Sequence, residues 1–212
     1  MTPTVVFDLD KVLLGGDAST LFLEGRLRRS PGRLLPLLLA APLLLLGTAI
    51  PQLRPVAARI MTRIAVGRRS DSDVEAVAEA YGAALTRKPE AAVAEAIAAV
   101  RRHLQTGDTV VIATGCEETL ARGFLRAIGL GDLEVVGSRA TVPVRRAMGE
   151  SKVTMLCERG YPPPWAAVYS DSASDLPLFA GTPRPVLVNA DGKAAQQVER
   201  TLGRRPETIT WR

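Results

Sequence analysis

Residues 4–10 read Thr-Val-Val-Phe-Asp-Leu-Asp, a short apolar and β-branched run that ends in two carboxylates one residue apart. Such a run predicts a buried strand of the kind found in parallel sheets. Because successive side chains of a strand alternate, Asp8 and Asp10 point to the same side and could share a cation. The alternative is that Asp10 caps the following turn while Asp8 is merely solvated at the strand end.

The chain after residue 105 alternates short apolar runs with amphipathic stretches. Further strands are predicted at residues 108–113 (DTVVIA), 133–136, 166–169 and 185–188, and helices at 117–128, 150–159 and 192–202. This alternation predicts an α/β fold with a doubly wound, Rossmann-like parallel sheet. In such a sheet, ligands bind beyond the carboxyl ends of the strands.

A helical insertion separates the first predicted strand from the rest of the sheet. Nearly everything from residue 17 to about residue 105 is predicted to be helical, with breaks at Pro31-Gly32, Pro51, Gly67 and Pro89. We therefore expect an α/β core made of residues 1–14 and 106–212, with a helical cap over residues 15–105.

Residues 34–53 (LLPLLLAAPLLLLGTAIPQL) carry no charge and, as one helix, would be just long enough to cross a bilayer. Three prolines and a glycine weaken a straight span, and a single crossing would separate Asp8 and Asp10 from everything after the segment. We expect two or more short helices, broken near Pro42 or Gly47. They would be a buried part of the cap or an apolar lip for peripheral membrane contact.

Composition excludes several classes of protein. The 212 residues are 47% hydrophobic and 23% charged, which is enough apolar surface for a folded domain. The net charge is +5, but the arginines are scattered and aromatic residues make up 4%, too few for a base-stacking platform, so we expect no nucleic-acid partner. An anionic small substrate fits at least as well. Two cysteines and an N-terminus without a secretory-signal pattern predict a cytoplasmic location.

Three further polar motifs occupy strand ends or helix starts. Thr114-Gly115 follows the second predicted strand, where a hydroxyl and free backbone N–H groups at a helix start could bind phosphate, or could form an ordinary cap. Lys152 lies at another predicted helix start, where a lone lysine is usually solvated. Asp171 and Asp175 are spaced to lie near one another in a turn, and alone they could be a polar loop with an N-cap.

In this order, the motifs FDLD (7–10), ATG (113–115), Lys152 and SDSASDL (170–176) resemble those of the haloacid dehalogenase superfamily. The resemblance is to subfamily IB, the phosphatase branch related to phosphoserine phosphatase, and it covers residues 4–189. This subfamily carries its helical cap between the first and second motifs. The resemblance implies a Mg²⁺-dependent phosphomonoesterase that acts through an aspartyl phosphate.

The resemblance implies a role for each aspartate of the first motif. Asp8 would be the nucleophile that takes the phosphoryl group. Asp10 would be general acid to the leaving alcohol and then general base to the attacking water. True dehalogenases lack this second aspartate, so Asp10 favours a phosphate ester over a halide.

The resemblance also implies ligands for a metal and for phosphate. Mg²⁺ would be held by Asp8, the backbone carbonyl of Asp10 and Asp171, with Asp175 behind them. Phosphoryl oxygens would be bound by Thr114, Gly115 and Lys152.

Three positions depart from the family pattern. Lys11-Val12 stands where many members have Gly-Thr, which adds a cation at the mouth of the site, and Ser170 replaces the usual glycine before Asp171. Asp17 has the position of the cap carboxylate that recognises the amino acid in phosphoserine phosphatases. It also opens the predicted helix, where N-capping is the alternative.

The apolar cap stretch sets the expected substrate class. It offers few polar partners to a free amino acid and many to an acyl chain, which favours a small-molecule or lipid phosphate ester with an apolar leaving group. The alternatives are a small phosphometabolite such as phosphoserine, and a catalytically silent binding or regulatory domain. Outside the motifs, we expect His103 to be a surface residue and Cys116 a buried thiol. No partner protein can be inferred.

Overall fold

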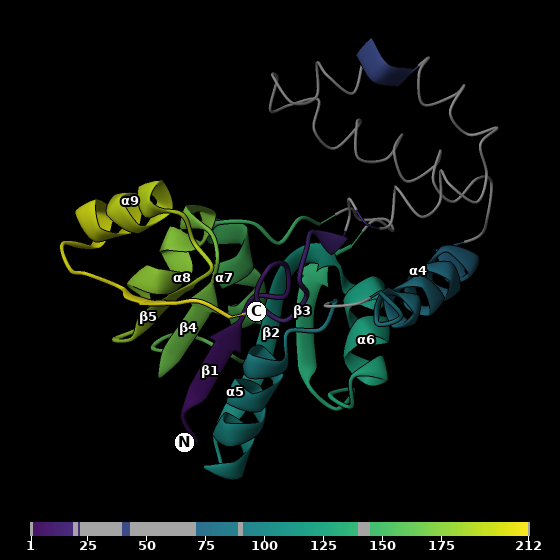
Figure 1. Ribbon diagram of the computed structural model, residues 1–212, viewed down its shortest axis with the longest axis horizontal. Helices are drawn as coiled ribbons and strands as arrows, with labels where there is room; N and C mark the ends of the chain where they lie inside the picture. Colours follow the sequence, from purple (N-terminus) through teal and green to yellow (C-terminus); the bar gives the residue numbers. More distant parts are fainter. Residues whose placement is uncertain are drawn as a thin grey trace.

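The computed structural model describes residues 2–18, 21, 40–42, 71–88, 91–139 and 145–211. Its centre is a six-stranded sheet in the order β3-β2-β1-β4-β5-β6, in which every neighbouring pair is parallel (Figure 1). The strands are β1 (Thr4–Phe7), β2 (Thr109–Glu117), β3 (Glu134–Ser138), β4 (Ala167–Ser170), β5 (Pro185–Val188) and β6 (Glu207–Ile209). This is the strand order of a doubly wound, Rossmann-like fold, so the predicted fold class is confirmed.

Helices cover both faces of the sheet, which explains why its central strands are apolar throughout. One buried cluster contains Val5 and Phe7 of β1, and a second contains Val6, whose side chain points to the other face. The first cluster is covered by α4 (Asp71–Leu85), α5 (Ala94–Gln105) and α6 (Glu118–Ala127). The second is covered by α7 (Glu150–Glu158), α8 (Leu176–Ala180) and α9 (Gly192–Leu202).

Helices α4 and α5 lie in the range predicted as cap, and both pack with the α/β core. Ala96 and Val100 of α5 are fully buried in the same cluster as Val5 and Phe7. Helix α4 packs closely on α6 at Gly82, where an added Cβ would lie 2.0 Å from the carbonyl oxygen of Leu120. The division into a core and a cap at residues 15–105 itself stays a prediction.

The predicted elements recur with small shifts, and one shift matters. Strand β5 and helix α9 have the predicted bounds. Strand β2 continues to Glu117, so Thr114 and Gly115 lie within the strand. The prediction of a turn at a helix start for these two residues is wrong. Strand β6 was not predicted, because three residues are too short to show an alternating pattern.

The apolar segment 34–53 lies outside the described residues except for 40–42. The predicted short helices, their break near Pro42 or Gly47 and any membrane contact therefore stay predictions. Across the ranges that the structure describes, no helix is long and apolar enough to span a membrane.

Candidate active site

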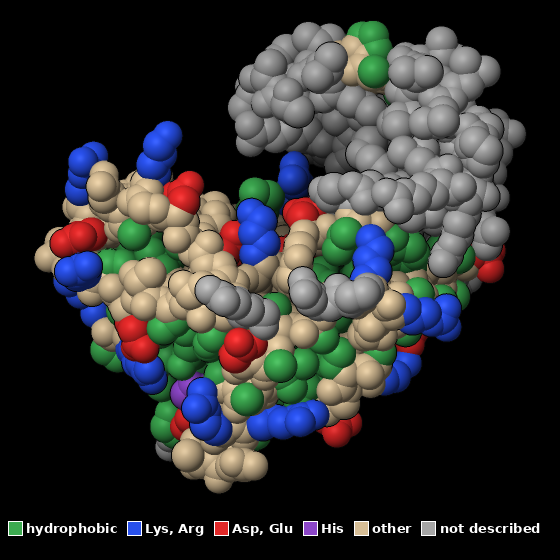
Figure 2. All heavy atoms as spheres, viewed as in Figure 1, with side chains coloured by type: hydrophobic (Ala, Val, Ile, Leu, Met, Phe, Trp, Pro, Cys, Tyr) green, Lys and Arg blue, Asp and Glu red, His purple; other side chains and the backbone are tan. Residues whose placement is uncertain are grey.

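The carboxyl ends of β1, β2 and β4 bring the predicted motifs to one edge of the sheet. Asp8 directly follows β1, and Asp171 directly follows β4, the strand paired with β1 on the other side from β2. Strand order reverses between β1 and β4, which is where doubly wound sheets bind ligands. At this upper edge of the described core, Figure 2 shows acidic and basic side chains side by side.

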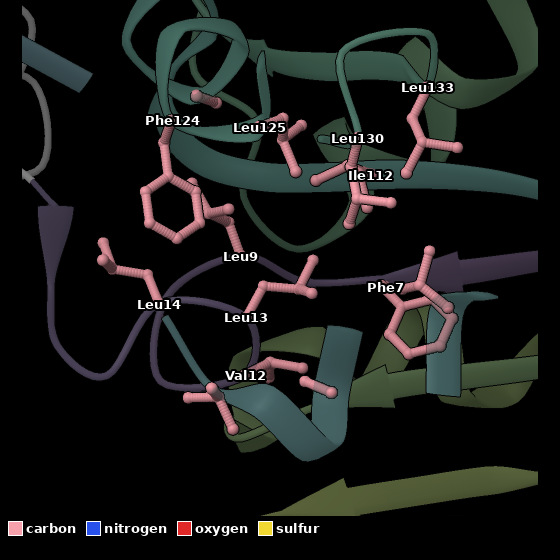
Figure 3. Close-up of a cluster of buried hydrophobic side chains, with 14 of the residues drawn as sticks. Phe7, Leu9, Val12, Leu13, Leu14, Ile112, Phe124, Leu125, Leu130 and Leu133 are labelled. Carbon is pink, nitrogen blue, oxygen red and sulfur yellow. The ribbon is translucent and has the colours of Figure 1, made fainter. Parts of the chain in front are cut away.

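The loop after β1 is fixed by its own apolar side chains. Leu9, Val12, Leu13 and Leu14 are fully buried and point into the cluster that Figure 3 shows beneath α6. The loop is also bound to residues 91–93, since Val93 donates its N–H to the Leu13 carbonyl at 3.0 Å. The polar residues between these anchors, Asp10 and Lys11, are therefore held in a defined place.

Asp8, directly before this loop, is part of a buried ion cluster. Lys152 Nζ is 3.2 Å from Asp8 Oδ2 and 2.8 Å from Asp175 Oδ2, and all three side chains are at most 9% exposed. Ser170 Oγ donates a further hydrogen bond of 2.7 Å to Asp175 Oδ2. Two carboxylates thus share one ammonium group, which leaves the cluster short of positive charge.

The electrostatics of Asp8 reflect that shortage. Burial raises the pKa of Asp8 to about 8, and the negative charges of Asp175 and Asp10 add to the rise, while Lys152 opposes it. Asp8 Oδ1 accepts the N–H of Leu9 at 2.7 Å, which fixes the side-chain orientation. A cation beside this carboxyl would favour its ionised form.

Asp10 lies on the same side and bonds to the start of the next helical segment. Its Oδ1 accepts the N–H of Ala18 at 2.7 Å, a capping contact to a helical residue eight positions on and not to the turn that directly follows Asp10. Burial raises the pKa of Asp10 to about 6, and the charges of Asp17 and Asp171 contribute to the rise. Asp17 itself is exposed and directly precedes the helical residue Ala18, and its charge acts on the carboxyl group of Asp10, which places it beside the site.

Asp171 meets the exposed lysine of the first loop. Lys11 Nζ lies 3.3 Å from Asp171 Oδ2, with the lysine side chain 61% and the aspartate side chain 14% exposed. Burial raises the pKa of Asp171, and Lys11 opposes the rise. The cation expected at the mouth of the site is therefore in place, paired with a predicted metal ligand.

Thr114 and Gly115 occupy an irregular stretch of β2. Thr114 is fully buried, its Oγ1 accepts the N–H of Cys116 at 3.0 Å, and the pairing of β2 with β3 shifts register just beyond it. Gly115 is exposed, and its carbonyl accepts a hydrogen bond from Ser138 Oγ at 2.7 Å. Because α6 begins only at Glu118, any phosphate contact here comes from a distorted strand end and not from a helix start.

Two side chains have contacts that sequence reasoning missed. Ser170, expected to be a departure from glycine, is the hydrogen-bond donor to Asp175 described above. His103, expected at the surface, is partly buried, with 19% of its side chain exposed. Its Nδ1 lies 2.8 Å from Asp108 Oδ2 and its Nε2 3.1 Å from the Tyr169 hydroxyl. The sequence feature that could have indicated the contact with Asp108 is the five-residue spacing of the two residues, between the last turn of α5 and the start of β2. Cys116 is buried, as predicted.

The described residues contain no group of three or more His, Cys, Asp or Glu side chains that could hold a metal ion. The predicted donor set is smaller, since it consists of the carboxylates of Asp8 and Asp171 and the carbonyl of Asp10. One or two carboxylates, completed by water and substrate phosphate, are what Mg²⁺ takes in many proteins. Asp175 Oδ1 is buried without a hydrogen-bond partner in the structure, and neighbouring carboxylates raise the pKa of one another. The residues therefore fit a hydrated divalent cation.

Comparison with known proteins gives the class of this molecule. Residues 5–180 match the family of haloacid dehalogenase-like hydrolases. The chain therefore belongs to this family, and its α/β core with aspartates at the ends of β1 and β4 is a hydrolase core. No curated protein matches the sequence.

Solved structures share the fold across nearly the whole chain. A protein of unknown function from Bordetella pertussis Tohama I is 21% identical, with a TM-score of 0.73 and 99% of each chain covered. The apo form of a phosphoserine phosphatase is 12% identical, with a TM-score of 0.59 and 99% of this chain and 94% of that chain covered. A phospho-aspartyl intermediate analogue of phosphoserine phosphatase is also 12% identical, with a TM-score of 0.54 and coverage of 92% and 90%. At these identities the likeness shows the fold.

Proposed function

We propose that this hydrolase is a Mg²⁺-dependent phosphomonoesterase that acts through an aspartyl phosphate on Asp8. One observation carries the proposal: Asp8, at the carboxyl end of β1, lies 3.2 Å from the buried ammonium group of Lys152, with Asp10 beside it. A carboxylate nucleophile, a fixed positive charge and a second carboxyl are the groups that phosphoryl transfer through an aspartate needs. The structural likeness to a phosphoserine phosphatase and to its phospho-aspartyl analogue supports the same chemistry.

The two half-reactions divide between Asp8 and Asp10. A carboxylate oxygen of Asp8 forms a bond to phosphorus while the ester P–O bond breaks, and Asp10 gives its proton to the leaving oxygen. Water then attacks the phosphoryl group, Asp10 takes a proton from that water, and the bond to Asp8 breaks to release phosphate. Asp10 suits both steps because burial raises its pKa to about 6, close to the working pH of a general acid and base.

Charge on the transferring oxygens would be balanced by Lys152 and by the metal. Lys152 is buried and paired with Asp175, so its ammonium group is already held in place before the substrate binds. Thr114 accepts a backbone N–H and can still donate its hydroxyl proton, and Gly115 lets the substrate approach an exposed strand end. Asp8, Asp171 and the Asp10 carbonyl would hold Mg²⁺, which when bound neutralises charge on the phosphoryl oxygens.

The leaving group that we propose is apolar or lipid-like. The support is the uncharged stretch at residues 34–53, which the sequence places between the first strand and α4, where it would meet the leaving group or a membrane surface. The second candidate substrate is a small phosphometabolite such as phosphoserine. It is supported by the structural neighbour with that activity and by Asp17 beside the site.

A panel of phosphate esters tests this proposal. Release of phosphate from a short-chain phosphatidic acid, from phosphoserine and from 4-nitrophenyl phosphate is measured with Mg²⁺ and after exhaustive chelation. We expect Mg²⁺-dependent turnover, highest for the lipid ester. Preference for phosphoserine would favour the second candidate. No turnover of any ester by a folded, Mg²⁺-loaded protein would favour a silent binding domain.

A further inference from the structure

Lys11 and Asn189 share an unusual backbone conformation. Among the described residues they are the two non-glycine residues with positive φ, at 55° and 53°. A residue with a Cβ atom enters this region at a cost in free energy, and such residues often cluster at functional sites. The two also contact each other, since Asn189 Nδ2 donates to the Lys11 carbonyl at 3.2 Å.

The surroundings fix this pair from both sides. Lys11 donates its N–H to the Gly16 carbonyl at 3.2 Å. Asn189 donates its N–H to the Ile209 carbonyl of β6 at 2.9 Å and accepts the N–H of Trp211 at 2.8 Å. The end of β6 thus holds Asn189, and Asn189 holds the backbone of Lys11 at the mouth of the site.

The Lys11 side chain is free to change partners, although its backbone is fixed. It is 61% exposed and reaches Asp171 Oδ2 at 3.3 Å. An exposed ion pair of this kind contributes little, so its loss costs little. Under the proposed function, Asp171 is a ligand to a divalent cation. Binding of that cation would weaken the attraction between Asp171 and Lys11 and leave the Lys11 ammonium group beside the phosphoryl site.

We propose that Lys11 binds a second anionic group of the substrate, carried by the leaving alcohol a few atoms from the scissile phosphate. This inference rests on the proposed function and narrows its substrate class. Among lipid-like phosphate monoesters, the preferred substrates would be those whose alcohol also bears an anionic group close to the scissile phosphate, such as a carboxylate, a phosphodiester or a second phosphate. The lysine ammonium group is a compact point charge, so it can bind any of these anionic groups.

A matched pair of phosphonates tests this inference by binding alone. Propylphosphonate carries one anionic group, and propane-1,3-diyl bisphosphonate carries two. Dissociation constants are measured by calorimetry at excess Mg²⁺ for the wild-type protein, Lys11→Gly and Lys11→Arg. Glycine adopts positive φ without strain, so the first variant keeps the backbone and loses the charge. Arginine keeps the charge.

We expect the wild-type protein to bind the bisphosphonate more tightly than propylphosphonate. The ratio of the two dissociation constants should fall about tenfold in Lys11→Gly, which is the lower end of what a charge-assisted hydrogen bond contributes. Lys11→Arg should retain most of it, and Asn189→Gly should lose a smaller part by freeing the Lys11 backbone. An unchanged preference in Lys11→Gly would overturn the inference. So would a loss equal for both phosphonates, because Lys11 would then act only through Asp171.

Hydrolysis of the corresponding esters separates this inference from the function on which it rests. Propyl phosphate, 3-phosphooxypropanoate and propane-1,3-diyl bisphosphate differ only in their second anionic group, and comparing the last two distinguishes a carboxylate from a phosphate. We expect kcat/KM for the doubly charged esters, relative to propyl phosphate, to fall about tenfold in Lys11→Gly. If none of the three is hydrolysed while the phosphonate preference still depends on Lys11, the phosphatase proposal fails and the anion site stands.

Discussion

Two lysine–aspartate pairs lie at the same edge of the sheet, and they differ in burial. Lys152 of α7 is 3% exposed between Asp8, which follows β1, and Asp175, which ends a short 3-10 helix after β4. Lys11 is 61% exposed against Asp171, on a loop. Removing one partner from a buried pair leaves an uncompensated charge, whereas an exposed pair can separate with little loss. The buried lysine therefore suits a constant task, and the exposed one suits a task that changes with the ligand.

The largest effect should come from Asp8→Asn. An amide cannot attack phosphorus, so hydrolysis of any phosphate ester should fall by more than about 10³-fold, as when a nucleophile is removed from other hydrolases. The fold should remain, because the amide has the same shape as the carboxylate, and circular dichroism checks this. If a tenth of the wild-type activity remained after deamidation was excluded, the covalent mechanism would be wrong.

The next effect separates the two lysines by stability. Lys152→Met should lower the free energy of unfolding by about 3–5 kcal/mol, because Asp8 and Asp175 stay buried without their cation. Lys11→Met, the matched control, should change it by less than about 1 kcal/mol. Urea denaturation at neutral pH measures both.

A double variant sharpens this contrast. Adding Asp175→Asn to Lys152→Met removes one of the stranded carboxylates and should restore part of the lost stability. Equal destabilisation by the two single lysine variants would contradict the comparison.

The convergence of the motifs was predictable from sequence because it follows from topology. Parallel strands end at one edge, so carboxylates after the first strand and after the strand at 167–170 had to lie near one another once the alternation was recognised. The apolar character of β1, β4 and β5 likewise follows from burial on both faces.

What the sequence could not provide depends on register and on long-range contacts. The continuation of β2 past Thr114 reflects pairing with β3, which local propensity does not reveal. The bond from Ser170 to Asp175 and the contact of His103 with Tyr169 join residues whose proximity only the folded chain defines. Lys11, which has a positive φ, accepts a hydrogen bond at its carbonyl from Asn189, 178 positions away.

Metal binding should distinguish the aspartates of the two pairs. Asp171→Asn should weaken Mg²⁺ binding more than Asp175→Asn, because only Asp171 is proposed as a direct ligand. Residues that support ligands typically change metal affinity by about 10–100-fold, which sets the scale for Asp175. Titration calorimetry with Mg²⁺ alone measures both without turnover. A greater loss in Asp175→Asn would mean that the metal lies deeper, beside the buried pair.

Stability should also depend on pH, because the carboxyl groups of Asp8 and Asp10 are buried. Burial raises the pKa of Asp8 to about 8 and that of Asp10 to about 6, while an unfolded aspartate titrates near pH 4. Between about pH 4 and pH 8 the folded, metal-free protein therefore keeps protons that the unfolded chain has lost. The free energy of unfolding should fall as pH rises through this window, by less than about 1.4 kcal/mol per pH unit for each group.

The difference between wild-type protein and Asp8→Asn isolates the contribution of Asp8 to this slope, since every other titrating group is shared. Urea denaturation at several pH values, with a chelator present, should show wild-type stability falling relative to the variant as pH rises. Mg²⁺ should flatten the difference, because a nearby cation favours the ionised carboxylate and lowers the pKa of Asp8. A wild-type stability that rises relative to Asp8→Asn over this window would mean that Lys152 outweighs burial at Asp8, and that the buried pair is a complete ion pair before any metal binds.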